Sequence, residues 1–124
     1  MTTKPFVILY VEDDDLVREW IAEALTTADR QVVAVGDVAG AREALREGNV
    51  NLLMTDLNLG EGDDAGHELA REALQQKPTL PVIVCSGHDA TDLVQSLGPT
   101  AHALRKPLGI NELRALIDRL AAAT

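Results

Sequence analysis

The stretch Leu52-Leu53-Met54-Thr55-Asp56 decides the fold of this chain. Four apolar or β-branched residues lead directly into one carboxylate. A short continuous run of this kind is typical of a strand that is covered on both faces, as in a parallel sheet. An ionised aspartate at the end of such a strand is costly to desolvate without a partner. We therefore expect Asp56 to belong to a functional site at the tip of the strand.

Other apolar runs also end in polar side chains. They lead into Glu12 and Asp13, into Ser86, and into Lys106. Segments with helical spacing of apolar residues separate these runs, and strand alternates with helix five times, which predicts an α/β sandwich with a parallel sheet. The expected strands cover residues 6–11, 31–35, 49–56, 82–85 and 101–105. The expected helices cover about 15–28, 38–47, 67–76 and 111–122, and a short helix starts at Asp89 or Thr91 and ends near Gly98. Asp14 or Asp15 is expected to cap the first helix and Asn111 the last.

In a doubly wound parallel sheet, ligands bind beyond the carboxyl ends of the strands where the strand order reverses. This arrangement would bring Glu12 and Asp13 beside Asp56. Carboxylates that meet in one crevice repel each other, and a hard divalent cation such as Mg²⁺ removes that conflict. An aspartate can also act as a nucleophile towards a phosphoryl group. Lys106, Ser86 and backbone amides could neutralise the charge of that group.

Composition narrows the classes of function. The 124 residues are 46% hydrophobic and 25% charged, as expected for one folded domain. The formal net charge of −9, concentrated partly at residues 12–15 and 61–64, argues against binding to nucleic acid or to an anionic membrane. Cys85 is the single cysteine, which suits a reducing cytosol. No signal peptide or transmembrane run is visible, so we expect a cytoplasmic protein.

Taken together, Asp13, Asp56, Ser86 and Lys106 resemble the site of bacterial two-component response regulator receiver domains. Each lies at the end of its own predicted strand, with separations of 43, 30 and 20 residues. The resemblance covers essentially the whole chain. It implies a single receiver domain over residues 1–124, with five helices around a five-stranded doubly wound sheet of order 2-1-3-4-5. This is a flavodoxin-like three-layer sandwich.

The resemblance also implies roles for individual residues. Asp56 matches the phosphoacceptor. Asp13 matches the residue that binds Mg²⁺ (or Mn²⁺) directly, and Glu12 matches its neighbour, which often acts through water. The backbone carbonyl of Asn58 matches the third protein ligand of the metal.

Five further positions follow from the same match. Ser86 matches the hydroxyl that turns inward to the phosphoryl group, and Gly87 a small residue that keeps access open. Lys106 matches the lysine that pairs with the phosphate, followed by a cis bond to Pro107. His88 and Asn58 match positions that flank the attacking water and tune dephosphorylation.

Two features depart from the pattern of the family. Ala103 occupies the position of the aromatic switch residue, so output is expected to use another route. Gly60 replaces a proline, and the loop from Gly60 to Gly66 is about two residues longer than usual. These changes are expected to alter access of the phosphodonor or affinity for the metal.

The expected function is that of a phosphoacceptor switch in a His-to-Asp phosphorelay, with a sensor histidine kinase or a histidine phosphotransfer protein as donor. Val17, Trp20 and Ile21 on the first helix form the expected docking face for the donor. Phosphorylation would change the surface formed by the helix from residue 91, the strand 101–105 and the last helix, for a downstream protein target. The chain is expected to be a monomer or a weak phosphorylation-dependent dimer.

Two alternatives stay open at this point. A haloacid dehalogenase-like phosphatase also phosphorylates an aspartate at a strand end, but its pattern is Asp-x-Asp, and Asn58 occupies the second position here. A pseudo-receiver, an interaction module that is never phosphorylated, is compatible with Ala103. In the leading interpretation the protein is not an enzyme beyond its own phosphotransfer and autodephosphorylation. The sequence fits a free-standing regulator and a receiver of a hybrid kinase equally well.

Overall fold

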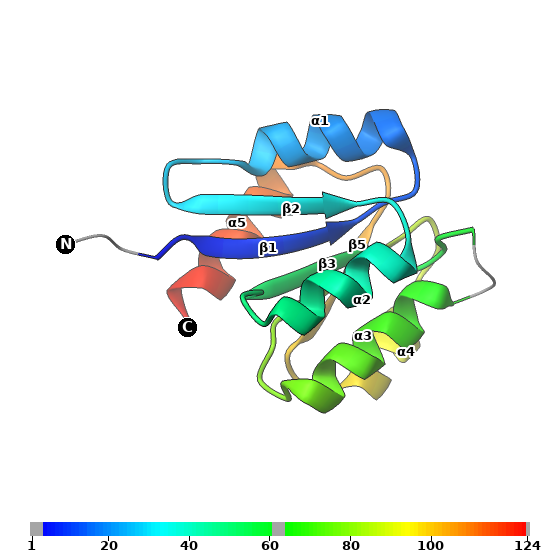
Figure 1. The fold of residues 1–124 in the computed structure, drawn as a ribbon. Helices are drawn as coiled ribbons and strands as arrows, with labels where there is room; N and C mark the ends of the chain where they lie inside the picture. The colour runs from blue at the N-terminus through cyan, green and yellow to red at the C-terminus, as the bar shows by residue number, and fades with distance from the viewer. Residues whose placement is uncertain (1–3, 61–63, 124) are drawn as a thin grey trace.

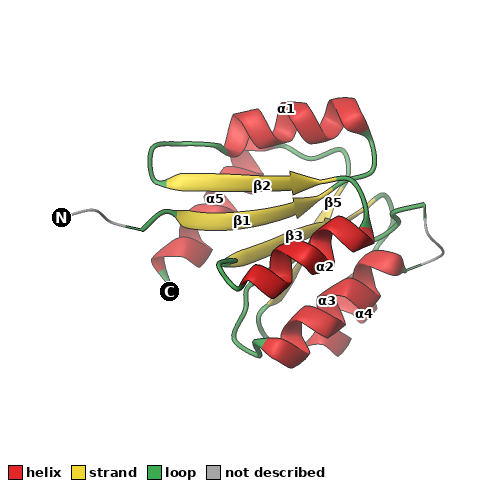
Figure 2. Ribbon diagram, in the orientation of Figure 1, coloured by secondary structure: helices red, strands yellow, loops and turns green. Residues whose placement is uncertain are grey.

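A five-stranded parallel sheet lies between two layers of helices (Figures 1 and 2). The computed structural model describes residues 4–60 and 64–123. The strands are β1 (Phe6–Val11), β2 (Arg30–Val35), β3 (Leu52–Asp56), β4 (Val82–Ser86) and β5 (Ala101–Arg105). The helices are α1 (Asp15–Leu25), α2 (Val38–Glu47), α3 (Ala65–Gln76), α4 (Thr91–Leu97) and α5 (Ile110–Ala122). The strand order is β2-β1-β3-β4-β5, which confirms the predicted topology.

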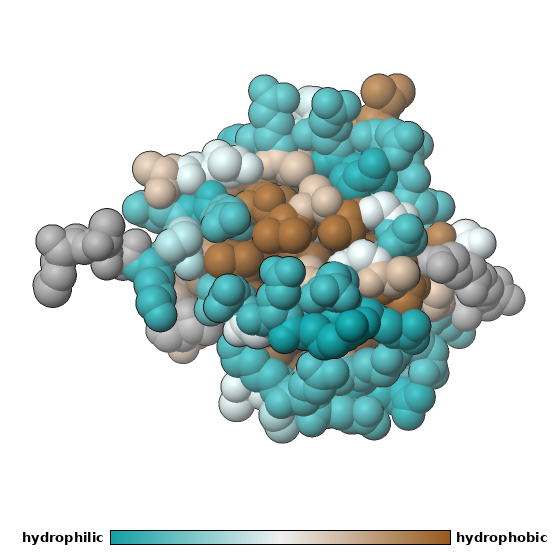
Figure 3. All heavy atoms as spheres, viewed as in Figure 1, coloured by the Kyte–Doolittle hydropathy of each residue, from teal (hydrophilic) through white to brown (hydrophobic). Residues whose placement is uncertain are grey.

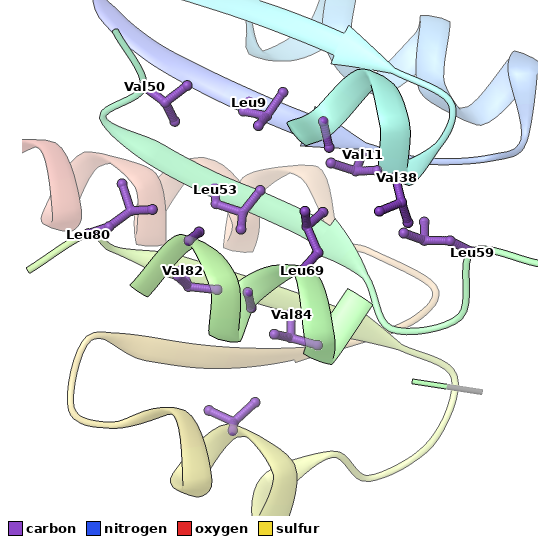
Figure 4. Packing of buried hydrophobic residues seen from close by; sticks show 14 residues of the cluster. Leu9, Val11, Val38, Val50, Leu53, Leu59, Leu69, Leu80, Val82 and Val84 are labelled. Atoms are coloured by element: carbon purple, nitrogen blue, oxygen red, sulfur yellow. The ribbon is translucent and has the colours of Figure 1, made fainter. Parts of the chain in front are cut away.

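Each face of the sheet carries its own hydrophobic core, because successive strand residues point to opposite faces. Helices α2, α3 and α4 cover one face, where Leu9 and Leu53 pack against Leu69 (Figure 4). Helices α1 and α5 cover the other face, where Tyr10 and Met54 pack with residues of both helices. The central strands β3 and β4 are buried at every position, as the continuous apolar runs predicted.

The edge strand β2 is less well covered. Val33 and Val35 are only half-buried, and a hydrophobic area is visible over β1 and β2 between α1 and α2 (Figure 3). The burial pattern therefore places the protected centre of the sheet at β3 and β4, the strands that carry Asp56 and Ser86.

Aspartate side chains cap the starts of two helices, Asp14 at α1 and Asp37 at α2. Asp14, one of the two predicted caps, accepts a hydrogen bond from the amide of Val17 at 3.0 Å. The predicted cap Asn111 is wrong: α5 begins at Ile110 after Gly109, with no side-chain cap. Leu108 and Ile110 pack against the α1–α5 core, and this packing starts the helix before Asn111.

Two boundaries differ from the predicted ones by three residues. Helix α1 ends at Leu25, three residues early, because the Thr26 hydroxyl donates to the carbonyl of Ala22 at 2.7 Å and the chain turns into a bridge with Arg30. Strand β3 begins at Leu52, three residues later than predicted. No helix among the described residues is long and apolar enough to cross a membrane.

Candidate functional site

The predicted site residues converge at the carboxyl edge of the sheet. Asp56 and Ser86 end their strands, Glu12 and Asp13 follow β1 directly, and Lys106 follows β5. Backbone hydrogen bonds hold the neighbouring strand ends in register. The Leu57 amide donates to the backbone carbonyl of Cys85 at 2.9 Å, and the Lys106 amide donates to that of Ser86 at 2.8 Å.

Strand alternation determines which side of the sheet each group comes from. Glu12, Asp56 and Lys106 each lie two residues beyond a residue packed in the α1–α5 core. The residues they follow are Tyr10, Met54 and Leu104. Ser86 lies two residues beyond Val84 of the opposite core, so its hydroxyl approaches the site from the α4 side.

Three carboxylates form a compact cluster. One oxygen from each of Glu12, Asp13 and Asp56 lies within 4.8 Å of the other two. Glu12 and Asp56 are buried, whereas Asp13 is exposed. Carboxylate oxygens at this spacing are the donors that Mg²⁺ and Mn²⁺ prefer, with the exposed side left for water or a phosphate.

Asp56 is buried without the hydrogen bonds that a buried carboxylate needs. Within residues 4–60 and 64–123, neither of its oxygens accepts a hydrogen bond, although the ammonium of Lys106 lies 3.0 Å from Oδ1 as an ion pair. Burial, and then the neighbouring Glu12, raise the pKa of Asp56 to about 8 against the opposing effect of Lys106. A divalent cation would complete this incomplete environment, so the residues fit Mg²⁺ or Mn²⁺.

Glu12 is better satisfied than Asp56. Its Oε2 accepts a hydrogen bond from the amide of Asp14 at 3.3 Å, and its Oε1 accepts one from the Tyr10 hydroxyl at 3.4 Å. Burial acts to raise the pKa of Glu12, but the neighbouring Asp56 carboxyl group, the hydrogen bond from the Asp14 amide and the charge of Lys106 outweigh it and lower that pKa.

Lys106 is held by the same carboxylates. Burial acts to lower the pKa of Lys106, but Asp56 and Glu12 outweigh it and raise that pKa. Its ammonium also lies 3.5 Å from Glu12 Oε1. The two carboxylates therefore keep the ammonium of Lys106 charged and close to Asp56, the candidate acceptor.

Sequence reasoning missed Tyr10 and Gly66. Tyr10 is fully buried and carries the one hydroxyl in an otherwise apolar strand, two residues before Glu12, and this pattern is visible in the sequence. Gly66 packs against the acceptor: a Cβ built on it would lie 1.8 Å from the carbonyl oxygen of Asp56. Its amide also donates to the carbonyl of Leu57 at 2.9 Å. The start of α3 therefore rests directly on the backbone of the candidate acceptor.

A pocket of about 500 Å³ opens beside Asp56 and Lys106, and Ser86, Gly87 and His88 contribute to its lining. The amide of His88 donates to the hydroxyl of Ser86 at 3.0 Å, which orients that hydroxyl. Gly87 has no atom within 4 Å of a built Cβ, consistent with an open approach. The roles of Gly87 and His88 stay predictions.

The loop after β3 shows why the proline is replaced. Gly60 has a φ of 73°, which proline cannot adopt. Its amide donates to the side-chain Oδ1 of Asn58 at 2.9 Å, forming a tight turn. Residues 61–63 of the predicted long loop lie outside the described residues, and the Asn58 carbonyl as a metal ligand stays a prediction.

The two conformational positions lie on and beside β5. The Lys106–Pro107 bond is cis, as the resemblance implied. Ala103 pairs with Val84 in the sheet and is exposed, with no aromatic side chain between β5 and α4 at that point.

The expected docking face on α1 needs one correction. Trp20 is 59% exposed and Val17 is 39% exposed, but Ile21 is 2% exposed and belongs to the α1–α5 core. Leu16, which is 79% exposed, takes its place on the surface. The helical period of 3.6 residues turns Ile21 inward when Leu16 and Trp20 face out.

Comparison with known proteins identifies the family. A profile of the response regulator receiver domain matches residues 8–118. The chain belongs to this family of receiver domains. It is therefore a receiver domain of two-component signalling, and the pseudo-receiver and phosphatase interpretations concern only what its site does.

Individual relatives support the assignment to the receiver family. This receiver domain is 35% identical to the response regulator receiver protein CpdR of Brucella abortus, over 94% of this chain and 97% of the relative. It is 36% identical to the regulatory protein VirG of Agrobacterium tumefaciens, but spans only 41% of that protein.

Solved structures support the fold. A response regulator receiver protein of Sinorhizobium medicae superposes with a TM-score of 0.85 and 28% identity, covering 98% of each chain. The chemotaxis response regulator CheY4 of Vibrio cholerae has a TM-score of 0.81 at 18% identity, a likeness of fold alone.

Proposed function

We propose that this receiver domain is a phosphorylation switch in which Asp56 accepts a phosphoryl group from a phosphohistidine. The donor would be a sensor histidine kinase or a histidine phosphotransfer protein. The observation that carries the proposal is the environment of Asp56, a buried carboxylate without hydrogen bonds, placed between an acidic cluster and the ammonium of Lys106.

The proposed step is a direct displacement at phosphorus. A carboxylate oxygen of Asp56 forms a bond to phosphorus while the bond from phosphorus to the imidazole nitrogen of the donor breaks. That nitrogen keeps the electron pair, and the product is an acyl phosphate on Asp56. A divalent cation held by Glu12, Asp13 and Asp56 would supply positive charge for the phosphoryl oxygens and would let Asp56 stay ionised near neutral pH.

Lys106 and Ser86 would hold the transferred group. The ammonium of Lys106 already lies at hydrogen-bonding distance from Asp56 Oδ1, so it can follow a phosphoryl oxygen with a small movement. Ser86 lines the same pocket from the other face of the sheet. Its hydroxyl can donate to the phosphoryl group while it accepts from the amide of His88.

Loss of the phosphoryl group would be hydrolysis of the acyl phosphate by water that enters through the pocket. His88 and Asn58 line this pocket and could set the rate of that entry. The protein would catalyse no turnover of an external substrate. Asn58 lacks the carboxylate that a phosphatase of the Asp-x-Asp type uses as a general acid.

The proposed surfaces for partners lie on different sides of the site. Helix α1 begins beside the acidic cluster and exposes Leu16 and Trp20, which suits contact with the phosphodonor. Output to a downstream protein, or weak dimerisation, is assigned to the α4-β5-α5 surface. There Ala103 leaves no aromatic rotamer to move, so displacement of α4 itself would carry the signal.

Intact mass measured after incubation with Mg²⁺ and phosphoramidate tests the proposal. We expect one added phosphoryl group on the parent protein, and none on Asp56→Asn or in the presence of EDTA. No adduct on the parent, despite bound metal and a stable complex with beryllofluoride, would indicate rapid hydrolysis. No adduct and no beryllofluoride complex would support the pseudo-receiver instead.

A further inference from the structure

The side chain of Arg18 reaches from the second turn of α1 back to the acidic cluster. Its Nη1 donates to the backbone carbonyl of Glu12 at 2.8 Å. Its Nη2 donates to Asp15 Oδ1 at 2.6 Å. The side chain of Arg18 is only 23% exposed, whereas that of Asp15 is 86% exposed. The bond to the Glu12 carbonyl is therefore the better protected of the two.

The carbonyl that Arg18 binds belongs to the peptide between Glu12 and Asp13, two of the three residues in the acidic cluster. The orientation of this peptide sets the direction of both carboxylates. The Glu12 amide on the other side is already fixed, since it donates to the carbonyl of Val35 at 3.1 Å. Arg18 thus supplies the second of two restraints on the backbone of Glu12.

Gly36, directly after β2, makes room for this contact. A Cβ built on Gly36 would lie 2.9 Å from Nη1 and 3.4 Å from Cζ of Arg18. The backbone of Gly36 is not in the left-handed region, so its conformation does not require glycine. The guanidinium of Arg18 therefore occupies the space that a side chain at residue 36 would enter.

We propose that Arg18 is a positioning residue for the divalent metal, which orients the Glu12–Asp13 peptide so that both carboxylates face Asp56. This inference rests on the proposed metal site. Arg18 is not among the residues that line the pocket beside Asp56 and Lys106. A residue that orients metal ligands typically changes metal affinity by about 10- to 100-fold when it is removed.

A positioning role for Arg18 and simple electrostatics predict opposite changes in metal affinity when its charge is removed. Arg18 carries a positive charge close to a cation site, so electrostatics alone would make Arg18→Gln bind the metal more tightly. If positioning dominates, Arg18→Gln binds it more weakly. Arg18→Lys keeps the charge but loses the planar pair of donors, so positioning predicts weaker binding for this variant as well.

The test is a titration with Mn²⁺ alone, in which electron paramagnetic resonance measures the free metal. We expect Arg18→Gln and Arg18→Lys to weaken binding about tenfold. Asp15→Asn, which removes an exposed ion pair, should change affinity less than about twofold. Arg46→Gln, which removes the same charge from an exposed pair on α2, serves as the matched control.

Gly36→Ala provides an independent variant if Arg18→Gln does not fold. It retains the charge of Arg18 but displaces the guanidinium, so it should also weaken Mn²⁺ binding. Parent-like or tighter binding by the folded Arg18→Gln or by Arg18→Lys would overturn the inference, as would parent-like binding by Gly36→Ala. If the parent itself fails to bind Mn²⁺, the metal site and this inference both fail, a result distinct from equal binding by parent and variants.

Discussion

The ammonium nitrogen of Lys106 lies 3.0 Å from Oδ1 of Asp56, at the ends of two strands that are not neighbours in the sheet. Strand β4 lies between them, so the lysine side chain spans the end of β4 to reach the carboxylate. The contact places a positive charge where the equatorial oxygens of a transferred phosphoryl group would develop negative charge.

Lys106→Met should separate binding of the metal from transfer of the phosphoryl group. Loss of this ammonium removes repulsion towards a divalent cation, so Mn²⁺ affinity should stay equal or rise. Phosphorylation by phosphoramidate should become slower, by about tenfold or more, because the stabilising charge is absent. Mn²⁺ titration and the rate of mass increase measure the two effects. Parallel loss of both would show that Lys106 mainly maintains the structure of the site.

Burial of Asp56 predicts a pH dependence of stability in the presence of EDTA. Its pKa is about 8 in the folded protein and 3.8 as the ordinary value, so the folded state holds a proton that the unfolded state releases between these pH values. The free energy of unfolding is therefore higher at low pH and falls as the pH rises from about 4 to about 8.

Asp56→Asn, which mimics the neutral carboxyl group, should not show this loss. Urea unfolding of both proteins across this range should give free energies that diverge by at least about 1.4 kcal/mol, the equivalent of one pKa unit. Added Mg²⁺ should remove most of the difference by stabilising the ionised carboxylate. Parallel curves in EDTA would contradict the raised pKa.

Gly66 and Gly87 form a matched pair for testing the contact beneath the acceptor. Gly66→Ala would place a methyl group 1.8 Å from the Asp56 carbonyl oxygen, so the start of α3 or the end of β3 must move. We expect a loss of roughly 2 kcal/mol or more in unfolding free energy. Gly87→Ala meets no neighbour and should stay within about 0.5 kcal/mol of the parent. Equal effects of the two substitutions in urea unfolding would argue against the contact.

Trp20→Ala tests the docking surface on α1. An exposed tryptophan at an interface is a frequent energetic anchor, and its loss should slow transfer from the cognate kinase about tenfold. Transfer from phosphoramidate should be unchanged, because Trp20 lies outside the pocket at Asp56. Leu16→Ala should show the same selectivity to a smaller degree. Equal slowing with both donors would refute docking through this face.

Much of the fold could be read from the sequence. Continuous apolar runs identified the buried strands β3 and β4, and the limits of β1, α2 and β5 were predicted correctly. These elements are determined by local pattern and by which faces must be buried. One predicted boundary failed where a tertiary contact won: at Asn111, Leu108 and Ile110 pack on the core and the helix begins one residue earlier.

The sequence by itself determined which residues meet at the carboxyl edge, because the ends of parallel strands share one edge. Only the tertiary structure decided how they meet. The contact of Gly66 with Asp56 and the reach of Arg18 across Gly36 depend on the distances between elements. A strand or helix pattern specifies which face a side chain occupies. It carries no information on distances of an ångström between side chains from separate elements, which are set by the packing of the whole domain.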